Sequence, residues 1–339
     1  MSRRAKLAMP SLRGHRVHMI PIAPIELDAI QAARDRISDV AFRTPLVRLD
    51  VRGPSREIWL KLECLQPIGS FKIRGAANAM ALADPDVLAR GVYTGSAGNM
   101  AQGVAFNARR LGIPCRVIVP DSAPQTKLAA IARLGATAVT VPFDEWWEVL
   151  RDHGHPDEHG FFVHPVSDPH VIAGNGTVGL EILEQLPEVA GVVVPFGGGG
   201  LSCGIASAMV AGHPEIPIYA AEVNTAAPLN ASFEAGQPVD VDRVPTFVDG
   251  IGGRGVLPEM WPLASSLLAG SRVVSIEAIC EAIRILAERT HVVAEGAGGA
   301  SLAAAMQGVD EGDGPIVAVV SGGNIDGNVL ATILEGGTP

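Results

Sequence analysis

The stretch GVVVPFGGGGLSCGIASAMVAG, residues 191–212, indicates the fold class because a strand, a glycine turn and a helix follow one another directly. GVVVPF is a short and continuous apolar run, which is typical of a strand buried on both faces of a sheet. Four glycines separate this run from an apolar helix. A buried strand followed at once by a helix is the repeating unit of a parallel sheet covered by helices. The stretch therefore predicts an α/β fold.

The same alternation of strand and helix extends through the chain on both sides of this stretch. The first predicted element is a helix with one apolar face, formed by Ile25, Leu27, Ile30 and Ala33. Gly112 stands where the helix that begins near residue 100 needs its C-terminal cap. Strands are predicted at 44–49, 57–63, 91–95, 115–120, 136–142, 191–196, 216–223, 271–276 and 315–324, and helices at 24–37, 100–112, 124–135, 171–187, 201–212 and 276–289.

The composition describes a globular chain with no sign of a nucleic-acid or membrane partner. Its 339 residues suffice for two domains, and with 47% hydrophobic and 18% charged residues general disorder is not expected. The net charge of −10 argues against a nucleic-acid surface, and no apolar run reaches the ~20 residues that span a bilayer. The four cysteines form no CxxC pair, which argues against disulfide and zinc sites and favours the cytoplasm: Cys64, Cys115, Cys203 and Cys280.

The N-terminal segment through His18 carries five Lys or Arg residues and no acidic residue. It lacks the apolar core of a signal peptide. We expect residues 1–23 to form a disordered tail, and a transit peptide is the alternative interpretation.

Four glycine-rich turns are predicted to follow strands, at 94–100, 195–201, 294–300 and 321–324. Such turns gather at the carboxyl ends of the strands in a parallel sheet, where ligands bind. The run from Gly197 to Gly200 can wrap a phosphate with successive backbone amides. A single turn of this kind could serve packing alone, but four in one chain favour a ligand site. None of them has the spacing of a Walker or Rossmann motif.

Lys72 lies in GSFKIRGAANAM, where we predict the first turn of a helix capped by Ser70. A helix N-terminus disfavours positive charge, and Phe71 and Ile73 provide apolar surroundings. Both effects lower the pKa of a lysine and make a neutral, nucleophilic amine accessible. Lys72 is therefore a candidate catalytic residue, and an ordinary surface lysine is the alternative.

Five segments together resemble the fold-type II enzymes that use pyridoxal 5'-phosphate (PLP). More narrowly, they are similar to the threonine and serine dehydratase (ammonia-lyase) group, to which serine racemase is related. The likeness runs in order from about Ile25 to Asn324. The segments are PIGSFKIRGA (67–76), GSAGNMAQGVA (95–105), HPVSDPHVIAGNGTVGLEI (164–182), VVVPFGGGGLSCGI (192–205) and VSGGN (320–324).

This resemblance implies a tryptophan synthase β-like fold of two three-layer αβα domains with open twisted sheets. The large PLP-binding domain would comprise residues 24–90 and 167–337, and the small domain, residues 91–166, would close over the substrate. It also implies a homodimer or a higher homo-oligomer.

The resemblance assigns roles to particular residues. Lys72 would hold PLP as a Schiff base and then act as the base at the substrate's Cα. Ser321 would face the pyridine nitrogen, with Gly250 and Glu295 nearby, and Asn99 would contact the ring hydroxyl. The remaining assignments are Phe71 against the pyridine ring, the amides of Gly197, Gly198, Gly199, Gly200 and Leu201 on the phosphate, and Ser96, Ala97, Gly98, Asn99 and Met100 on the substrate carboxylate.

The implied reaction is the β-elimination of a β-hydroxy α-amino acid, which yields a 2-oxo acid and ammonia. A neutral Ser321 beside the ring nitrogen makes the ring a weaker electron sink than a carboxylate would, which favours prompt loss of the β-hydroxyl group. Proton donation from the PLP phosphate would assist that departure. The chain ends soon after SGGN, so no C-terminal regulatory domain and no isoleucine feedback through one are expected.

Several positions depart from the pattern of the group. Ala97 stands where serine racemases carry a serine, which disfavours racemisation. Met100 replaces a histidine, and Gly252 and Gly253 replace bulkier polar residues. Together with a nearby pair of tryptophans, Trp146 and Trp147, these changes suggest a less polar pocket and a substrate larger than serine, although a packing change at Met100 and a core or interface position for the tryptophans are alternatives.

Two clusters that resemble metal sites are discounted. His153, His155 and His159 lie in a DHGHPDEHG loop that we interpret as solvated, because no accompanying ligand spacing is recognisable. Glu222 and Ala226 match positions of a divalent-cation site in the family, but the next expected ligand is Pro228. No metal is predicted.

The sequence leaves three rival functions open. The first is PLP-dependent β-replacement, as in cysteine synthases, and the second is an amino-acid racemase. The third is a PLP-binding regulatory protein without turnover.

Overall fold

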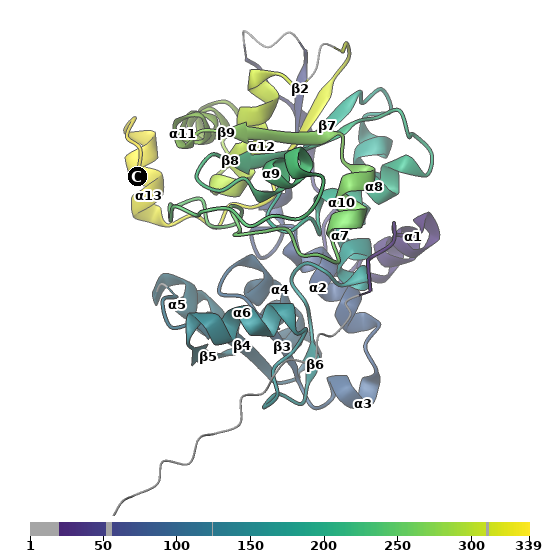
Figure 1. Ribbon diagram of the computed structural model, residues 1–339, viewed down its shortest axis with the longest axis vertical. Helices are drawn as coiled ribbons and strands as arrows, with labels where there is room; N and C mark the ends of the chain where they lie inside the picture. The colour runs from purple at the N-terminus through teal and green to yellow at the C-terminus, as the bar shows by residue number, and fades with distance from the viewer. Residues whose placement is uncertain (1–19, 52–55, 124, 310–311) are drawn as a thin grey trace, which may run out of the picture.

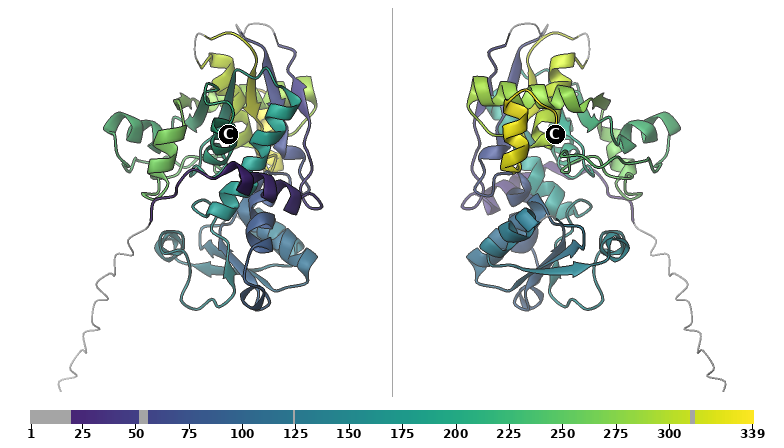
Figure 2. Two further views of the ribbon diagram at one scale, coloured as in Figure 1. Left: turned by 90° about the vertical axis from the view of Figure 1, so that its right-hand side faces the viewer. Right: turned by 90° about the vertical axis from the view of Figure 1, so that its left-hand side faces the viewer.

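We describe residues 20–51, 56–123, 125–309 and 312–339 of a computed structural model of the chain. They form two lobes, each built around its own β-sheet (Figure 1). The two side views of Figure 2 show the lobes stacked on one another, with helix α1 (Leu27–Arg36) near their junction. Among these residues no helix combines the length and the apolar character that a membrane crossing requires.

The larger lobe contains, within the described ranges, a six-stranded sheet of order β1-β2-β10-β7-β8-β9. Every neighbouring pair is parallel except β1 and β2, which form an antiparallel pair at one edge. The sequence predicted a parallel sheet, and this edge pair departs from it because a short connection joins the two strands. The strands are β1 (Leu46–Arg48), β2 (Ile58–Lys61), β7 (Gly191–Pro195), β8 (Ile218–Val223), β9 (Gly270–Val274) and β10 (Ile316–Val319).

The smaller lobe is built on a parallel sheet of order β5-β4-β3-β6, four strands in the described part of the chain. Its strands are β3 (Val92–Gly95), β4 (Cys115–Pro120), β5 (Thr137–Val141) and β6 (Phe161–Phe162). The strands predicted at 91–95, 115–120 and 136–142 are thus confirmed.

Helices cover both sheets, and most follow a strand directly. Gly112 ends α4 in the left-handed conformation (φ 69°), as predicted for a C-terminal cap. Besides α1, the helices are α2 (Lys72–Ala81), α3 (Pro85–Leu88), α4 (Asn99–Leu111), α5 (Gln125–Arg133), α6 (Phe143–Arg151), α7 (Pro169–Gln185), α8 (Ser202–Val210), α9 (Pro228–Ala235), α10 (Trp261–Leu267), α11 (Ile276–Ile285), α12 (Gly296–Gln307) and α13 (Gly327–Leu334), with a 3₁₀ turn, η1 (Glu63–Leu65), and a π turn, η2 (Leu286–Thr290).

Successive residues of each central strand enter different cores, which makes each lobe a three-layer structure. In β7, Val193 packs with residues of α11 and α12, whereas Val192 and Val194 pack with residues of α7 and α8. In β4, Val117 faces α4, and Ile118 faces α6 on the other side. The predicted α/β fold with helices on both faces of the sheets is confirmed.

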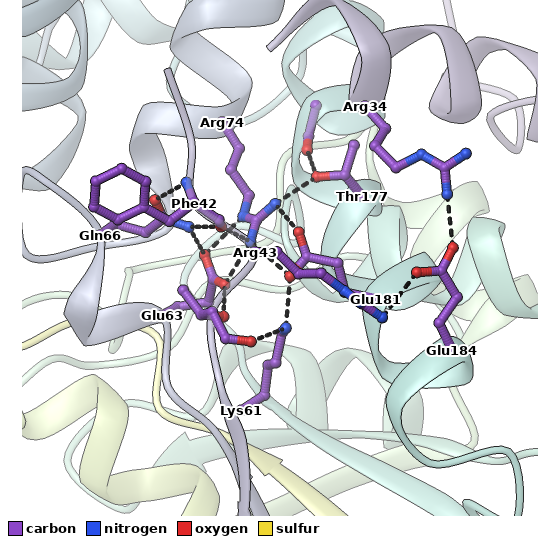
Figure 3. A network of polar contacts seen from close by, with 12 residues as sticks. Arg34, Phe42, Arg43, Lys61, Glu63, Gln66, Arg74, Thr177, Glu181 and Glu184 are labelled. Carbon is purple, nitrogen blue, oxygen red and sulfur yellow. Dashed lines mark hydrogen bonds and ion pairs between the residues drawn. The ribbon is translucent and has the colours of Figure 1, made fainter. Parts of the chain in front are cut away.

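A buried network of four charged side chains joins α2 and α7 to β2 (Figure 3). The guanidinium of Arg74 donates to both oxygens of Glu63 (2.8 Å each) and of Glu181 (2.7 and 3.0 Å). Lys61 Nζ also reaches Glu181, at 2.5 Å. Burial alone would raise the pKa of Glu63, but Arg74 holds it below its ordinary value. We call these residues, Lys61, Glu63, Arg74 and Glu181, the Arg74 network.

Two local predictions are wrong. Ser70 does not cap α2, because its backbone pairs with Gly322 and the helix starts after Phe71 without a side-chain cap. The turn at 294–300 does lead into α12, but no strand precedes it: residues 286–290 form the π turn and 291–295 are irregular.

Residues 1–23 are predicted to form a disordered tail, and residues 1–19 of it lie outside the described part of the chain. The last part of it is packed: Ile22 is buried, and its amide donates to the carbonyl of Glu259 at 3.0 Å. We therefore place Ile22 in the folded chain.

Candidate active site

The site forms where the glycine-rich turns of the two lobes meet. Asn99, at the start of α4 in the smaller lobe, donates to Glu295 Oε1 (2.7 Å) at the start of α12 in the larger lobe. Asn324 of the SGGN turn donates to Asn99 Oδ1 at 2.7 Å. These contacts bring together three of the four turns that the sequence analysis singled out.

Lys72 begins helix α2 and is partly exposed. Its Nζ donates to the carbonyl of Pro165 at 2.7 Å and lies 5.1 Å from the centre of the Phe71 ring. Burial lowers the pKa of Lys72 to about 8, and the more weakly acting charge of Glu295 opposes this shift. A larger fraction of this amine is neutral near physiological pH than for an ordinary lysine, so it can act as a nucleophile or base.

The backbone ties the lysine segment to the SGGN turn. The amide of Phe71 donates to the carbonyl of Ser321 (3.0 Å), and the amide of Gly323 donates to the carbonyl of Gly69 (2.8 Å). Ser321 itself is buried. The position of Ser321 relative to Lys72 is therefore set by main-chain hydrogen bonds.

The glycine loop 197–201 is held tightly between two other segments. A Cβ atom at Gly197 would lie 2.8 Å from the carbonyl oxygen of Gly250, and one at Gly198 would lie 2.7 Å from both methyl groups of Val166. Gly199 has φ +98°, which favours glycine. For the amide groups of residues 197–201, no acceptor occurs within the described part of the chain. These amides are thus free to bind an anion such as a phosphate.

Glu295 lies beside the loop that Gly250 occupies. A Cβ atom at Gly250 would lie 3.5 Å from Glu295 Oε1. Burial raises the pKa of Glu295 to about 7, and the hydrogen bond from Asn99 opposes that shift. A carboxyl group in this state can exist in its neutral form near physiological pH.

The predicted substrate loop, 96–100, divides between open and buried positions. Ser96 Oγ accepts from the amide of Gly98 (3.2 Å), and a Cβ atom at Gly98 would meet no atom within 4 Å. Ala97 is partly buried against the core of the smaller lobe. Met100 is only 1% exposed and packs between α2 and α4 with Ala76 and Met80. This burial favours the packing alternative for Met100, because the first turn of α4 directs the side chain into the core.

The tryptophans are also packed against the fold. Trp146, on α6, packs against Tyr93, Ile118 and Val149, on the face of the small sheet opposite α4. Trp147 is next to it, with ring centres 6.3 Å apart. This packing favours the core alternative for Trp146, whose ring Trp147 contacts.

Glu222 has a structural role in the described fold. It accepts hydrogen bonds from the amides of Leu229 and Asn230 (2.9 and 2.8 Å) at the start of α9 and from Ser271 Oγ (2.6 Å). Its carboxylate therefore satisfies three donors.

The histidine loop is less solvated than predicted, because two of its members are tied into the fold. His153 stacks on His164 (ring centres 4.2 Å apart) and lies 3.4 Å from Glu259 Oε1. His155 Nε2 lies 3.1 Å from Glu145 Oε1. Among the described residues no group of His, Cys, Asp and Glu side chains has an arrangement that could hold a metal ion.

Sequence reasoning did not identify several residues of this region. Asn324 belongs to the VSGGN motif, but the sequence did not predict its hydrogen bond to Asn99. Lys127 on α5 pairs with Asp249, which adjoins Gly250, and links the two lobes beside Glu295. Pro165 and Val166 contact Lys72 and Gly198, respectively, and only their place within a quoted segment pointed to them.

These residues fit a cofactor that has an aldehyde and a phosphate group. A lysine with a lowered pKa can condense with the aldehyde, and the free amides of residues 197–201 can hold the phosphate. Residues 165 and 166 connect the lysine to the glycine loop, because the carbonyl of Pro165 accepts from Lys72 and the side chain of Val166 lies beside Gly198.

Adding one methyl group to the glycine loop should weaken cofactor binding. In Gly198→Ala the new Cβ atom overlaps Val166, and overpacking of this kind costs about 1–3 kcal/mol. We therefore expect roughly 5–150-fold weaker binding of pyridoxal phosphate to the apoprotein, measured by absorbance titration. Gly212→Ala is the control, since a Cβ atom there meets nothing within 4 Å. Equal affinities of Gly198→Ala and the unmodified protein would contradict the assignment of the loop.

Three comparisons with known proteins show which chains this one is similar to. The family model for pyridoxal-phosphate dependent enzymes matches residues 37–322. An L-threonine ammonia-lyase from Thermotoga maritima is 40% identical over 318 residues, which cover 92% of this chain and 79% of the relative. The structure of maize serine racemase superposes with a TM-score of 0.84 at 31% identity, covering 93% of this chain and 98% of that one. The structure of a T.th. threonine deaminase gives a TM-score of 0.78 at 32% identity, covering 89% and 99%.

Proposed function

Because this chain belongs to the pyridoxal-phosphate dependent enzymes, we propose that it is an ammonia-lyase that converts a β-hydroxy α-amino acid into a 2-oxo acid and ammonia. The observation that carries this proposal is the 40% identity to an L-threonine ammonia-lyase across nearly the whole chain. The water that leaves from Cα and Cβ is returned when the enamine product hydrolyses, so the net products are the 2-oxo acid and ammonia. Pyridoxal phosphate is the cofactor.

We assign the proton transfer at Cα to Lys72. When bound, the cofactor supplies an electron sink for the bonding pair left at Cα. Lys72 Nζ removes the proton, and its lowered pKa increases the share of the neutral amine that can do so. The amides of residues 197–201 would hold the phosphate, Phe71 would pack against the ring, and Asn99 would contact the ring hydroxyl, with Gly250 and Glu295 nearby.

We place Ser321 beside the ring nitrogen. A carboxylate at this place would keep the ring nitrogen protonated, whereas the neutral hydroxyl would not; the ring would then stabilise charge at Cα less, which favours prompt loss of the β-hydroxyl group. The substrate carboxylate is received by the backbone of residues 96–100. In this loop the backbone amide of Met100 would donate to the substrate carboxylate, whereas its side chain is buried.

We propose a substrate of the size of L-threonine or L-serine. Met100 and the tryptophan pair suggested a larger substrate, but Met100 is buried in a core and Trp146 packs against one, which favours the packing alternatives. The names of the relatives point the same way, since they act on threonine.

The test is the kcat/KM of the purified holoenzyme for L-threonine, L-serine and threo-phenylserine, measured by 2-oxo acid formation. We expect L-threonine to exceed threo-phenylserine by at least about tenfold, the scale of one mismatched apolar contact. Met100→His should lower stability by about 1–3 kcal/mol, because it buries a polar ring, and should leave the substrate ranking unchanged. A preference for threo-phenylserine would instead support an enlarged pocket.

The products formed by the same enzyme preparation distinguish β-elimination from two other reactions. β-Replacement would consume added sulfide and form an amino acid in place of the 2-oxo acid. Racemisation would form the D-isomer, and Ala97 argues against it because its side chain carries no exchangeable proton. A binding protein without turnover would give neither product.

We also propose a cytoplasmic homodimer or higher homo-oligomer. The four cysteines are free and buried, which fits a reducing compartment. Light scattering of the purified protein would measure the mass in solution and exclude a monomer if the proposal holds.

A further inference from the structure

His164 is a buried histidine that the proposed mechanism does not use. Its Nε2 lies 3.0 Å from the carbonyl of Leu150, whereas its Nδ1 accepts from the amides of Val166 (3.1 Å) and Ser167 (2.7 Å). A ring nitrogen that accepts from amides carries no proton, and one that donates to a carbonyl must carry one. These partners therefore define the neutral Nε2–H tautomer.

The surroundings keep this histidine neutral. Burial, and then the stacked ring of His153, lower the pKa of His164 to about 3. Ser167 Oγ lies 3.2 Å from Nδ1, and the charges of Glu259 and Lys72 also act on this ring, in opposite directions. His164 is thus a fixed hydrogen-bonding group at physiological pH.

The peptide group between Pro165 and Val166 connects His164 to Lys72. In a trans peptide the N–H and C=O groups lie in one plane and point in opposite directions. Because His164 Nδ1 binds the N–H of Val166, the carbonyl of Pro165 is directed away from the ring, where it accepts from Lys72 Nζ at 2.7 Å. The side chain of Val166 meets the glycine loop at Gly198.

We propose that His164 is a positioning residue that aims the carbonyl of Pro165 at the free amino group of Lys72. An amine that donates one N–H to this carbonyl has its lone pair directed elsewhere, which orients the base before it takes the proton at Cα. The inference rests on the proposed function, in which Lys72 performs this step. It assigns to His164 no contact with substrate or cofactor.

Two neutral substitutions of His164 test its two ring nitrogens one at a time. His164→Asn keeps an acceptor at the place of Nδ1 and loses the bond to Leu150. His164→Gln keeps a donor at the place of Nε2 and loses the acceptor for Val166 and Ser167. His153→Asn is the control, because it removes the stacked ring without touching the 165–166 peptide, and asparagine tolerates its positive φ of 53°.

We expect His164→Gln to lower kcat on the order of 100-fold, the cost of misplacing a reacting group by about 1 Å, with little change in KM. The rate at which the apoprotein captures pyridoxal phosphate, followed by absorbance, should fall by at least about tenfold for the same reason. His164→Asn should recover most of both rates, and His153→Asn should retain them.

The outcomes distinguish this inference from the proposed function. Turnover by the unmodified enzyme supports the function whatever the variants do, and absence of turnover contradicts it while the capture rates still test His164. If the Asn and Gln variants fold and behave alike, the positioning role is wrong. Should neither variant fold, nitrogen NMR of the unmodified protein decides: a proton on Nδ1 of His164 between pH 6 and 8 would overturn the proposal, and an unprotonated Nδ1 would support it.

Discussion

Replacing Lys72 with alanine should abolish β-elimination and leave the fold intact. Loss of a general base alone costs about 10²–10⁴-fold in kcat, and this variant also loses the covalent attachment of the cofactor. The fold should not suffer, because burial disfavours the charged form of this amine and lowers its pKa to about 8. Product formation by the variant and its circular dichroism spectrum test both statements.

The pKa shift gives this variant a further signature. The folded protein releases the Lys72 proton near pH 8 and the unfolded chain near the ordinary value of 10.5, so the unfolded state binds more protons between these values. The free energy of unfolding of the unmodified apoprotein should therefore rise relative to that of Lys72→Ala as the pH rises through this window. A difference between the two that does not change with pH would show that Lys72 is not desolvated.

Chemical labelling provides the control. Borohydride treatment of the holoenzyme should fix the cofactor's carbon skeleton to Lys72, and peptide mapping should find no label on Lys127 at the edge of the site. A label on Lys127, or full activity of Lys72→Ala, would contradict the assignment.

Breaking the Arg74 network should have the largest effect on stability. Arg74→Met removes one of two buried positive charges and leaves the carboxylates of Glu63 and Glu181 opposite Lys61 alone. Removing one partner of a buried ion pair costs about 3–5 kcal/mol, because the remaining charge is uncompensated. Urea unfolding of the apoproteins measures this cost.

A second substitution tests whether the cost arises from charge imbalance. Arg74→Met combined with Glu63→Gln restores one positive and one negative charge, and we expect this double variant to be more stable than the single one. The exposed pair Arg34–Glu184 is the surface control: Arg34→Met should cost no more than about 1 kcal/mol. If the double variant is no more stable than Arg74→Met, lost packing and not charge explains the effect.

The sequence by itself determined the fold class and most of the order of elements. Short apolar runs such as 117–119 and 191–195 are typical of buried strands between helices, and Gly112 ends its helix where predicted. Periodicity and end signals of this kind are local, so each can be read from a window of a few residues. Lys72 and the glycine loop were candidates for the same reason. The apolar residues beside Lys72 and the consecutive glycines of the loop are both visible in a short window of sequence.

Only the tertiary structure decided which side chains meet. Met100 is buried in a core because α2 packs against the face of α4 that carries it. Ser70 pairs with a residue of the SGGN turn instead of capping its own helix. Arg74 meets Glu181 across 107 positions of sequence, and Lys72 meets Pro165 across 93. Such contacts depend on which faces of distant elements pack together, and the period of each element's own residues does not contain that information.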